Sequence, residues 1–243
     1  MVAEWPLAQK LAGERDTLGH YLSGHPLDPH RSELKALVGS DLGQLDALWE
    51  AGSHARKGGN GTGEGGRGGW RQEVTAIVAG QVGAVRKRGE SQAFVVLEDG
   101  RGRIECAFFS EAWLEHAPLL AGNRIVIVEG GLREDEFSGG FSLRARRAWD
   151  FHEVCSQSAQ RLSLRLDLAR AGILDRVEAL LAAHRPGATA LRLDLLLPTG
   201  AAGTLDLDAS SAVRVDPDLL GELRAEPGVR AVHVAMGARP WAT

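Results

Sequence analysis

The sequence predicts a mainly β domain followed by a small α+β domain, with short helices in front of both. Three observations carry this prediction. Between residues 74 and 149 hydrophobic residues recur with a period of two, which is typical of half-buried strands. Nine of the eighteen residues from Gly52 to Gly69 are glycine, which is the composition of a linker. From residue 162 onward strand-like and helix-like segments alternate, as in an α+β domain.

The β domain contains five β-rich runs and one helical stretch. The runs are Val74 to Val85, Ala93 to Leu97, Ile104 to Phe108, Ile125 to Leu132 and Phe141 to Trp149. We expect a helix at Ser110 to Leu120, after the third run, with Ser110 as its N-cap. Three strands, a helix and two strands within about eighty residues is the order of a five-stranded OB-fold barrel. A β-sandwich is less favoured, because it needs about seven strands.

Residues 1–51 are expected to form a helical connector segment. Leucines at helical spacing predict a first helix from about Leu7 that ends near Ser23, and a second short helix is expected from Pro29 to Val38. The two are too small for a core of their own, so they should pack on another part of this chain or on a partner. Residues 52–69 are expected to be a Gly-rich flexible linker.

The OB-fold domain is expected at residues 70–152 and the α+β domain at 160–243. The latter should contain strands at Leu162 to Leu168, Ala190 to Leu197, Thr204 to Leu207 and Val229 to Val234, and helices at Gly172 to His184 and Pro217 to Ala225.

Composition excludes several classes of protein. No window approaches 18 consecutive apolar residues and no signal-peptide pattern opens the chain, so we expect a cytoplasmic protein with no membrane span. Two cysteines, Cys106 and Cys155, can build neither a disulfide framework nor a Cys-rich zinc site. The formal net charge of −4 provides no global positive field, so any nucleic-acid binding must come from local patches.

No set of residues predicts a catalytic site, a metal site or a cofactor in this chain. Two-metal phosphoryl transfer needs converging carboxylates, and the close acidic groupings are Glu134 to Glu136, in an expected hairpin, and Asp206 with Asp208, on the wet face of a strand. Cys106 alternates with apolar neighbours, which favours a core residue over a nucleophile.

The stretch E-R-D-T-L-G-H-Y-L-S-G-H-P-L-D, from Glu14 to Asp28, resembles the segment that joins the catalytic part of the bacterial DNA polymerase III alpha subunit to its OB domain. Ala93 to Glu105, Phe108 to Glu111 and Phe137 to Gly140 resemble that OB domain. The resemblance extends from about Leu11 to the C-terminus and implies a C-terminal fragment of this DNA-directed DNA polymerase, a nucleotidyltransferase. The family's carboxylates that hold magnesium belong upstream, and none is implied in these residues.

OB barrels bind single strands with a basic groove and aromatic platforms, chiefly on strands two and three and in the loops that follow strands one and four. The candidate nucleic-acid-binding residues are Arg86, Lys87 and Arg88 in the first loop, Phe94 on strand two, Arg101 and Arg103 beside the next turn, and Arg144 and Arg146 on strand five. Phe94 has a second interpretation, as a ring packed under the N-terminal helices. Residues 70–150 hold 11 Lys and Arg against 12 Asp and Glu, so binding should be weak and salt-sensitive.

The expected partners are single-stranded template DNA and the rest of the polymerase and replisome. The resemblance implies that the C-terminal domain docks the clamp-loader tau subunit, and the Leu-rich runs Leu193 to Pro198 and Val213 to Leu223 offer apolar surface for a partner. Val229 to Met236 lacks the family's terminal clamp-binding pattern of a Gln before spaced aliphatic and aromatic residues. The alternative is a stand-alone OB-fold protein that serves as a protein-protein assembly module.

Overall fold

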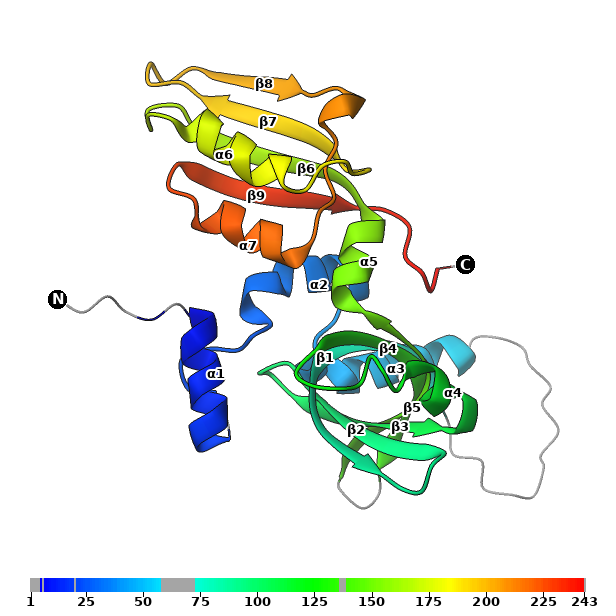
Figure 1. Cartoon of the computed structure of the whole chain (residues 1–243). Coiled ribbons are helices and arrows are strands. Elements are labelled where there is room, and N and C mark those ends of the chain that lie inside the picture. Colours follow the sequence, from blue (N-terminus) through cyan, green and yellow to red (C-terminus); the bar gives the residue numbers. More distant parts are fainter. Residues whose placement is uncertain (1–4, 6, 20, 58–72, 136–138, 243) are drawn as a thin grey trace. The chain divides into compact units, whose positions relative to one another are not determined.

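A computed structural model of the protein describes residues 5, 7–19, 21–57, 73–135 and 139–242 (Figure 1). The chain divides into two compact units, Met1–Asp150 and Phe151–Thr243. Most of the predicted linker, residues 58–69, lies outside the described residues.

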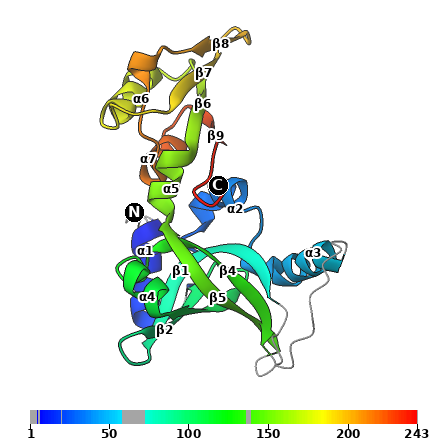
Figure 2. The same ribbon diagram turned by 90° about the vertical axis from the view of Figure 1, so that its right-hand side faces the viewer.

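Five strands of the first unit close into a barrel, which confirms the predicted OB-like architecture (Figures 1 and 2). They are β1 (Val74–Lys87), β2 (Gln92–Glu98), β3 (Arg103–Phe109), β4 (Ile125–Asp135) and β5 (Gly140–Asp150). The order around the barrel is β1-β2-β3-β5-β4, and β3 with β5 form its parallel pair. The long β1 pairs with β4 through its first half and with β2 through its second half, and so closes the barrel.

The side chains inside the barrel are those that the period-two pattern places together. On β2 and β3 they are Ala93, Val95, Leu97, Ile104, Cys106 and Phe108, each at most 1% exposed. Burial raises the pKa of the Cys106 thiol, which marks it as a core residue rather than a nucleophile. The alternate residues of both strands therefore form the outer face of the barrel.

The described part of the N-terminal segment contains three α-helices, where the sequence predicted two helices. They are α1 (Leu7–Leu18), α2 (Arg31–Val38) and α3 (Leu45–Lys57). The prediction that the first helix reaches Ser23 is wrong, because Gly19 adopts a left-handed conformation, with φ of 76°, and its N–H closes onto the Arg15 carbonyl at 2.9 Å.

The prediction that the linker begins at residue 52 is also wrong, because α3 continues to Lys57. Asp41 and Gln44 form a capping box before α3, and Leu42 and Leu45 join the barrel core. Gly52 lies against Val74 so closely that a Cβ at Gly52 would be 1.9 Å from Val74 Cγ1. This glycine therefore permits close packing of helix on strand.

Helix α4 (Ser110–His116) follows β3, as predicted, but ends earlier than Leu120. Ser110 is not its N-cap; Phe109 occupies that position, and no side chain caps the helix. Ser110 instead has a positive φ of 44°, and its N–H donates to the Ser91 carbonyl at 2.6 Å. This bond ties the β3–α4 corner to the β1–β2 loop.

The second unit is a four-stranded sheet with the order β8-β7-β6-β9, and α6 and α7 lie on one of its faces (Figure 2). Its elements are α5 (Phe151–Ser158), β6 (Ala159–Asp167), α6 (Ile173–Ala182), β7 (Ala190–Leu196), β8 (Ala202–Asp206), α7 (Pro217–Ala225) and β9 (Val229–Met236). The predicted α+β class is confirmed. Helix α5 was not predicted; the unit begins with it, at Phe151, whereas the sequence placed the second domain from residue 160.

One of the two Leu-rich runs proposed as partner surface belongs to the core. Val213, Val215, Leu219, Leu220 and Leu223 are fully buried, because this run supplies the apolar face of α7 and the segment before it. The interpretation of Val213 to Leu223 as an exposed run is therefore wrong.

Candidate nucleic-acid interface

The β1–β2 loop carries the first basic cluster. Arg86 and Lys87 are the last residues of β1 and Arg88 follows them, and all three side chains are exposed. Arg86 forms an ion pair with Glu105 of β3, and Lys87 Nζ lies 5.7 Å from the centroid of the Trp113 ring. Arg88 has no side-chain partner in the described part of the chain, so it is the most available cation of the three.

An aromatic cluster lies beside this loop on the outer face of β2 and β3. The ring centroids of Phe94 and Phe109 are 6.4 Å apart and the rings are nearly perpendicular, at 83°. The Arg144 guanidinium carbon of β5 lies 6.0 Å from the centroid of Phe109. Phe109 therefore stands between a second ring and a planar cation, the two kinds of group on which nucleic-acid bases stack.

The Phe94 ring contacts the Phe109 ring of the neighbouring strand. The second interpretation of Phe94 placed its ring under the N-terminal helices instead. Phe109 was not among the predicted site residues. The same alternation that identifies Cys106 as inward-facing places Phe109 on the outer face with Glu105, so the signal was present in the sequence.

The other arginines of β5 point outward but have acidic partners. A register shift between Glu129 and Gly130 of β4 leaves Arg146 without a residue opposite it, so both Arg146 and Arg147 are exposed. Arg146 lies 3.8 Å from Glu73, and Arg147 Nε lies 3.0 Å from Glu129. Arg144 has no acidic partner among the described residues.

Arg101 and Arg103 lie at the opposite end of the β2–β3 hairpin from the β1–β2 loop, since Glu98 pairs with Arg103 and Gln92 with Phe109. Arg101 forms an ion pair with Asp41 at 2.6 Å, which ties it to the N-terminal segment. The structure therefore does not bring the eight candidate residues into one patch. The length of β2 separates Arg101 and Arg103 from the other six candidates, which are Arg86, Lys87, Arg88, Phe94, Arg144 and Arg146.

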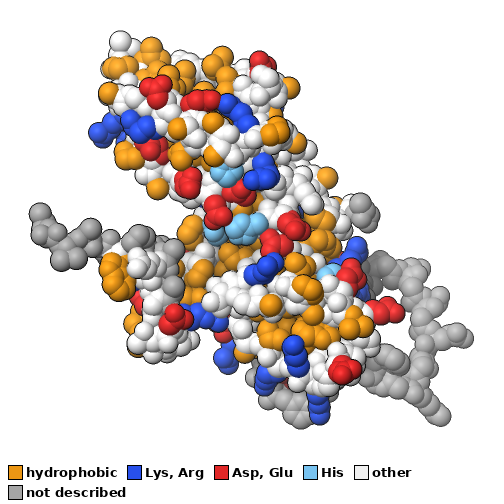
Figure 3. Space-filling view, viewed as in Figure 1, with side chains coloured by type: hydrophobic (Ala, Val, Ile, Leu, Met, Phe, Trp, Pro, Cys, Tyr) orange, Lys and Arg blue, Asp and Glu red, His pale blue; other side chains and the backbone are white. Residues whose placement is uncertain are grey.

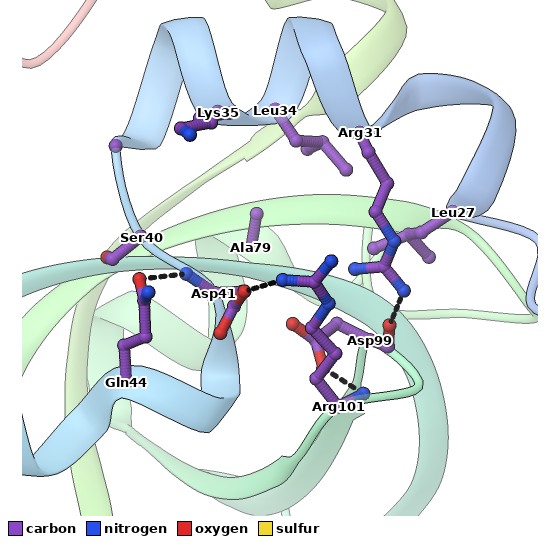
Figure 4. Close-up of a pocket in the computed structure, with 11 residues that line it drawn as sticks. Leu27, Arg31, Leu34, Lys35, Ser40, Asp41, Gln44, Ala79, Asp99 and Arg101 are labelled. Carbon is purple, nitrogen blue, oxygen red and sulfur yellow. Dashed lines mark hydrogen bonds and ion pairs between the residues drawn. The ribbon is translucent and has the colours of Figure 1, made fainter.

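A cavity of about 170 Å³ lies between α2 and the β2–β3 turn, and Figure 4 shows residues that line it. Two arginines that line it, Arg31 and Arg101, are engaged by neighbouring residues. Arg31 donates to the Asp99 carbonyl at 2.6 Å, and Arg101 pairs with Asp41. These contacts hold the N-terminal segment onto the barrel. The cavity therefore lies at the place where the N-terminal segment packs against the barrel.

In Figure 3, hydrophobic side chains gather on the barrel, and Lys and Arg side chains lie beside them. This combination suits single-stranded nucleic acid, whose backbone follows cations and whose bases stack on apolar rings. The barrel's near-neutral charge means that such binding depends on the local cluster and weakens steeply with salt.

No group of three or more His, Cys, Asp or Glu side chains within the described ranges has a geometry that holds a metal ion. Asp206 pairs with Arg192 at 2.9 Å, and Asp208 accepts N–H groups of Ser210 and Ser211. Both carboxylates of this grouping thus have local structural roles. Within those ranges, too, no helix is long and apolar enough to cross a membrane.

Comparisons with known proteins support the OB-fold barrel, and they also match the residues outside it. A model described as an OB-fold nucleic acid binding domain matches residues 76–150. The chain is 50% identical over 241 residues to the DNA polymerase III subunit alpha of Xylella fastidiosa, covering 98% of this chain and 20% of that protein. The proteins of the same name in Pseudomonas aeruginosa and Escherichia coli K12 are 33% and 31% identical, over 93% and 95% of this chain and 18% of each relative. The chain thus spans about one fifth of the length of these relatives.

Proposed function

The chain is homologous to the C-terminal part of the bacterial DNA polymerase III alpha subunit, and from this premise we propose that it is the noncatalytic C-terminal portion of a replicative DNA polymerase. In this proposal the barrel binds single-stranded template during DNA replication. The second unit attaches the polymerase to the replisome through the clamp-loader tau subunit. Magnesium is expected only at the upstream polymerase site.

The observation that supports template binding is the position of the aromatic cluster beside the β1–β2 loop. Phe94 offers a hydrophobic platform on β2, and Arg88 offers a cation without a side-chain partner in the part of the chain that the structure describes. In OB folds this face and this loop are the usual place of oligonucleotides.

Fluorescence anisotropy with a labelled single-stranded oligonucleotide, at several salt concentrations, tests this proposal. We expect binding at low salt that falls steeply as salt rises, and weaker binding of a duplex with the same sequence. Failure to bind the single strand even at low salt would contradict template binding. That result would favour the alternative, an OB-fold protein that uses its barrel only for protein contacts.

The surface that supports attachment is the β7–β8 half of the second unit's sheet. Leu193 and Leu195 of β7 are only partly buried, and Leu205, opposite Leu193 on β8, is 48% exposed. The apolar side of the sheet is therefore open toward β8, which among the described residues is an edge strand.

We expect Leu205→Asp to weaken binding of purified tau subunit by about fivefold or more, since it places a charge in the apolar surface. The matched control is Leu114→Asp, at an exposed leucine of α4 in the other unit. Equal tau binding by the wild-type chain and Leu205→Asp would remove β8 from the attachment surface.

A further inference from the structure

We propose that Arg144 contacts a nucleic-acid base by stacking, as one end of a composite platform formed with Phe109 and Phe94. The inference rests on the proposed template binding and assigns a role to a residue of that surface. The sequence alone does not distinguish Arg144 from Arg146, because alternation places both on the same face of the strand.

The strand register builds the platform. Phe94 of β2 is opposite Ala107 of β3, and Ala107 is opposite Arg144 of β5, so the three residues form one row across the outer face. Phe109 is two residues beyond Ala107 on the same face of β3. The small Ala107 leaves the space between Phe94 and Arg144 to the Phe109 ring, which contacts both.

The electrostatic surroundings separate Arg144 from the other arginines of this face. Arg86 is paired with Glu105, Arg146 with Glu73 and Arg147 with Glu129. Arg144 has no acidic partner among the described residues and lies 6.0 Å from the centroid of the Phe109 ring, whereas Arg147 has both an acidic partner and a ring, Trp149, at 5.6 Å. The residue opposite Arg144 on β4 is Gly131, and the space over this glycine is occupied by the carboxylate of Glu73, which pairs with Arg146.

This environment favours the planar use of the guanidinium. A guanidinium is planar, so an exposed one without an acidic partner can present a flat face to a base while its positive charge remains. A lysine ammonium keeps the charge but has no flat face. Arginine and lysine therefore differ at a stacking site and are nearly equivalent at a simple phosphate contact.

The test uses two variants and two oligonucleotides of equal length, one of thymidines and one in which several central positions are abasic. We expect Arg144→Lys to reduce affinity for the thymidine strand by about fivefold or more, with an unchanged salt slope. With the abasic strand, wild type and Arg144→Lys should bind equally. The matched control is Arg165→Lys, the same exchange at an exposed arginine of β6 in the second unit, which should change neither affinity.

Phe109→Leu removes the ring beneath Arg144 and should reproduce the loss on the thymidine strand. Equal affinity of wild type and Arg144→Lys for the thymidine strand would overturn the stacking role while leaving template binding intact. An equal loss on both oligonucleotides would also overturn it, since the lost contact would then not involve bases. If the wild-type chain bound neither oligonucleotide, the proposed function itself would fail.

Discussion

The backbone N–H of Leu42 donates a hydrogen bond of 2.9 Å to Oδ2 of Asp99, 57 residues further along the chain. Asp99 is only 2% exposed, and its Oδ1 accepts the N–H groups of Arg101 and Gly102, both at 2.8 Å. One buried carboxylate therefore closes the β2–β3 turn and fastens the N-terminal segment to it. This contact lies at the end of β2 opposite the proposed template-binding loop.

Asp99→Ala should destabilise the first unit by about 3 kcal/mol, because it leaves three backbone N–H groups without their acceptor. Urea unfolding followed by tryptophan fluorescence measures the loss. Glu90→Ala, an exposed acidic residue of the β1–β2 loop, should change stability by no more than about 0.5 kcal/mol. A similar small effect of Asp99→Ala would show that the N-terminal segment is held by its apolar contacts alone.

Replacing Arg86, Lys87 and Arg88 together by Ala should flatten the logarithmic salt dependence of single-strand binding by about 2, since each phosphate contact contributes about 0.7. Among the single variants, Arg88→Ala should lower the salt slope by the full contribution of one phosphate contact, about 0.7. The reason is that its side chain has no partner among the described residues. The control is Arg165→Ala, an exposed arginine of β6. An unchanged slope in the triple variant would remove this loop from the binding surface.

Phe94→Ala should weaken single-strand binding by about fivefold or more with little change of the salt slope, because stacking releases no counterions. Phe94→Tyr keeps an aromatic ring and should bind nearly as well as wild type. Both affinities come from the same anisotropy titrations. Full affinity of the alanine variant would mean that Phe94 serves only to pack against Phe109.

Local alternation was enough to predict the barrel. It placed Val95 inside the barrel and Phe94 outside it. The one helical stretch, which begins at Ser110 between the third and fourth strands, indicated the order of elements of an OB fold. What the sequence did not predict depends on contacts between distant residues. The pairing of Arg101 with Asp41 joins positions 60 residues apart, and no pattern near Arg101 distinguishes a structural cation from one that binds nucleic acid.

Helices α3 and α5 were missed for related reasons. The end of α3 contains Gly52 and runs into glycine-rich sequence, so its composition resembles a linker although Leu45 packs into the barrel core. Helix α5 begins directly after β5 at Phe151, with no turn residue between the two. In both cases tertiary burial decides the structure where local sequence signals are weak.

At Gly52, helix propensity and packing predict opposite effects of a substitution by alanine. Alanine is favoured over glycine inside a helix by about 1 kcal/mol, so propensity alone predicts that Gly52→Ala stabilises α3. The new Cβ would stand 1.9 Å from Val74 Cγ1, and Val74 is a buried residue at the start of β1. We therefore expect a net loss of about 1–3 kcal/mol in urea unfolding, because overpacking forces the helix away from the strand.

A double-mutant cycle shows whether this clash is the cause. In the Val74→Ala background the Cγ1 atom is gone, so adding Gly52→Ala should cost at least about 1 kcal/mol less than it does in the wild type. Gly13→Ala in α1 is the control, because no packing partner of the added Cβ lies within 4 Å in the described part of the chain, and it should be neutral or slightly stabilising. Additive losses in the cycle would mean that Gly52 matters for a reason other than its contact with Val74.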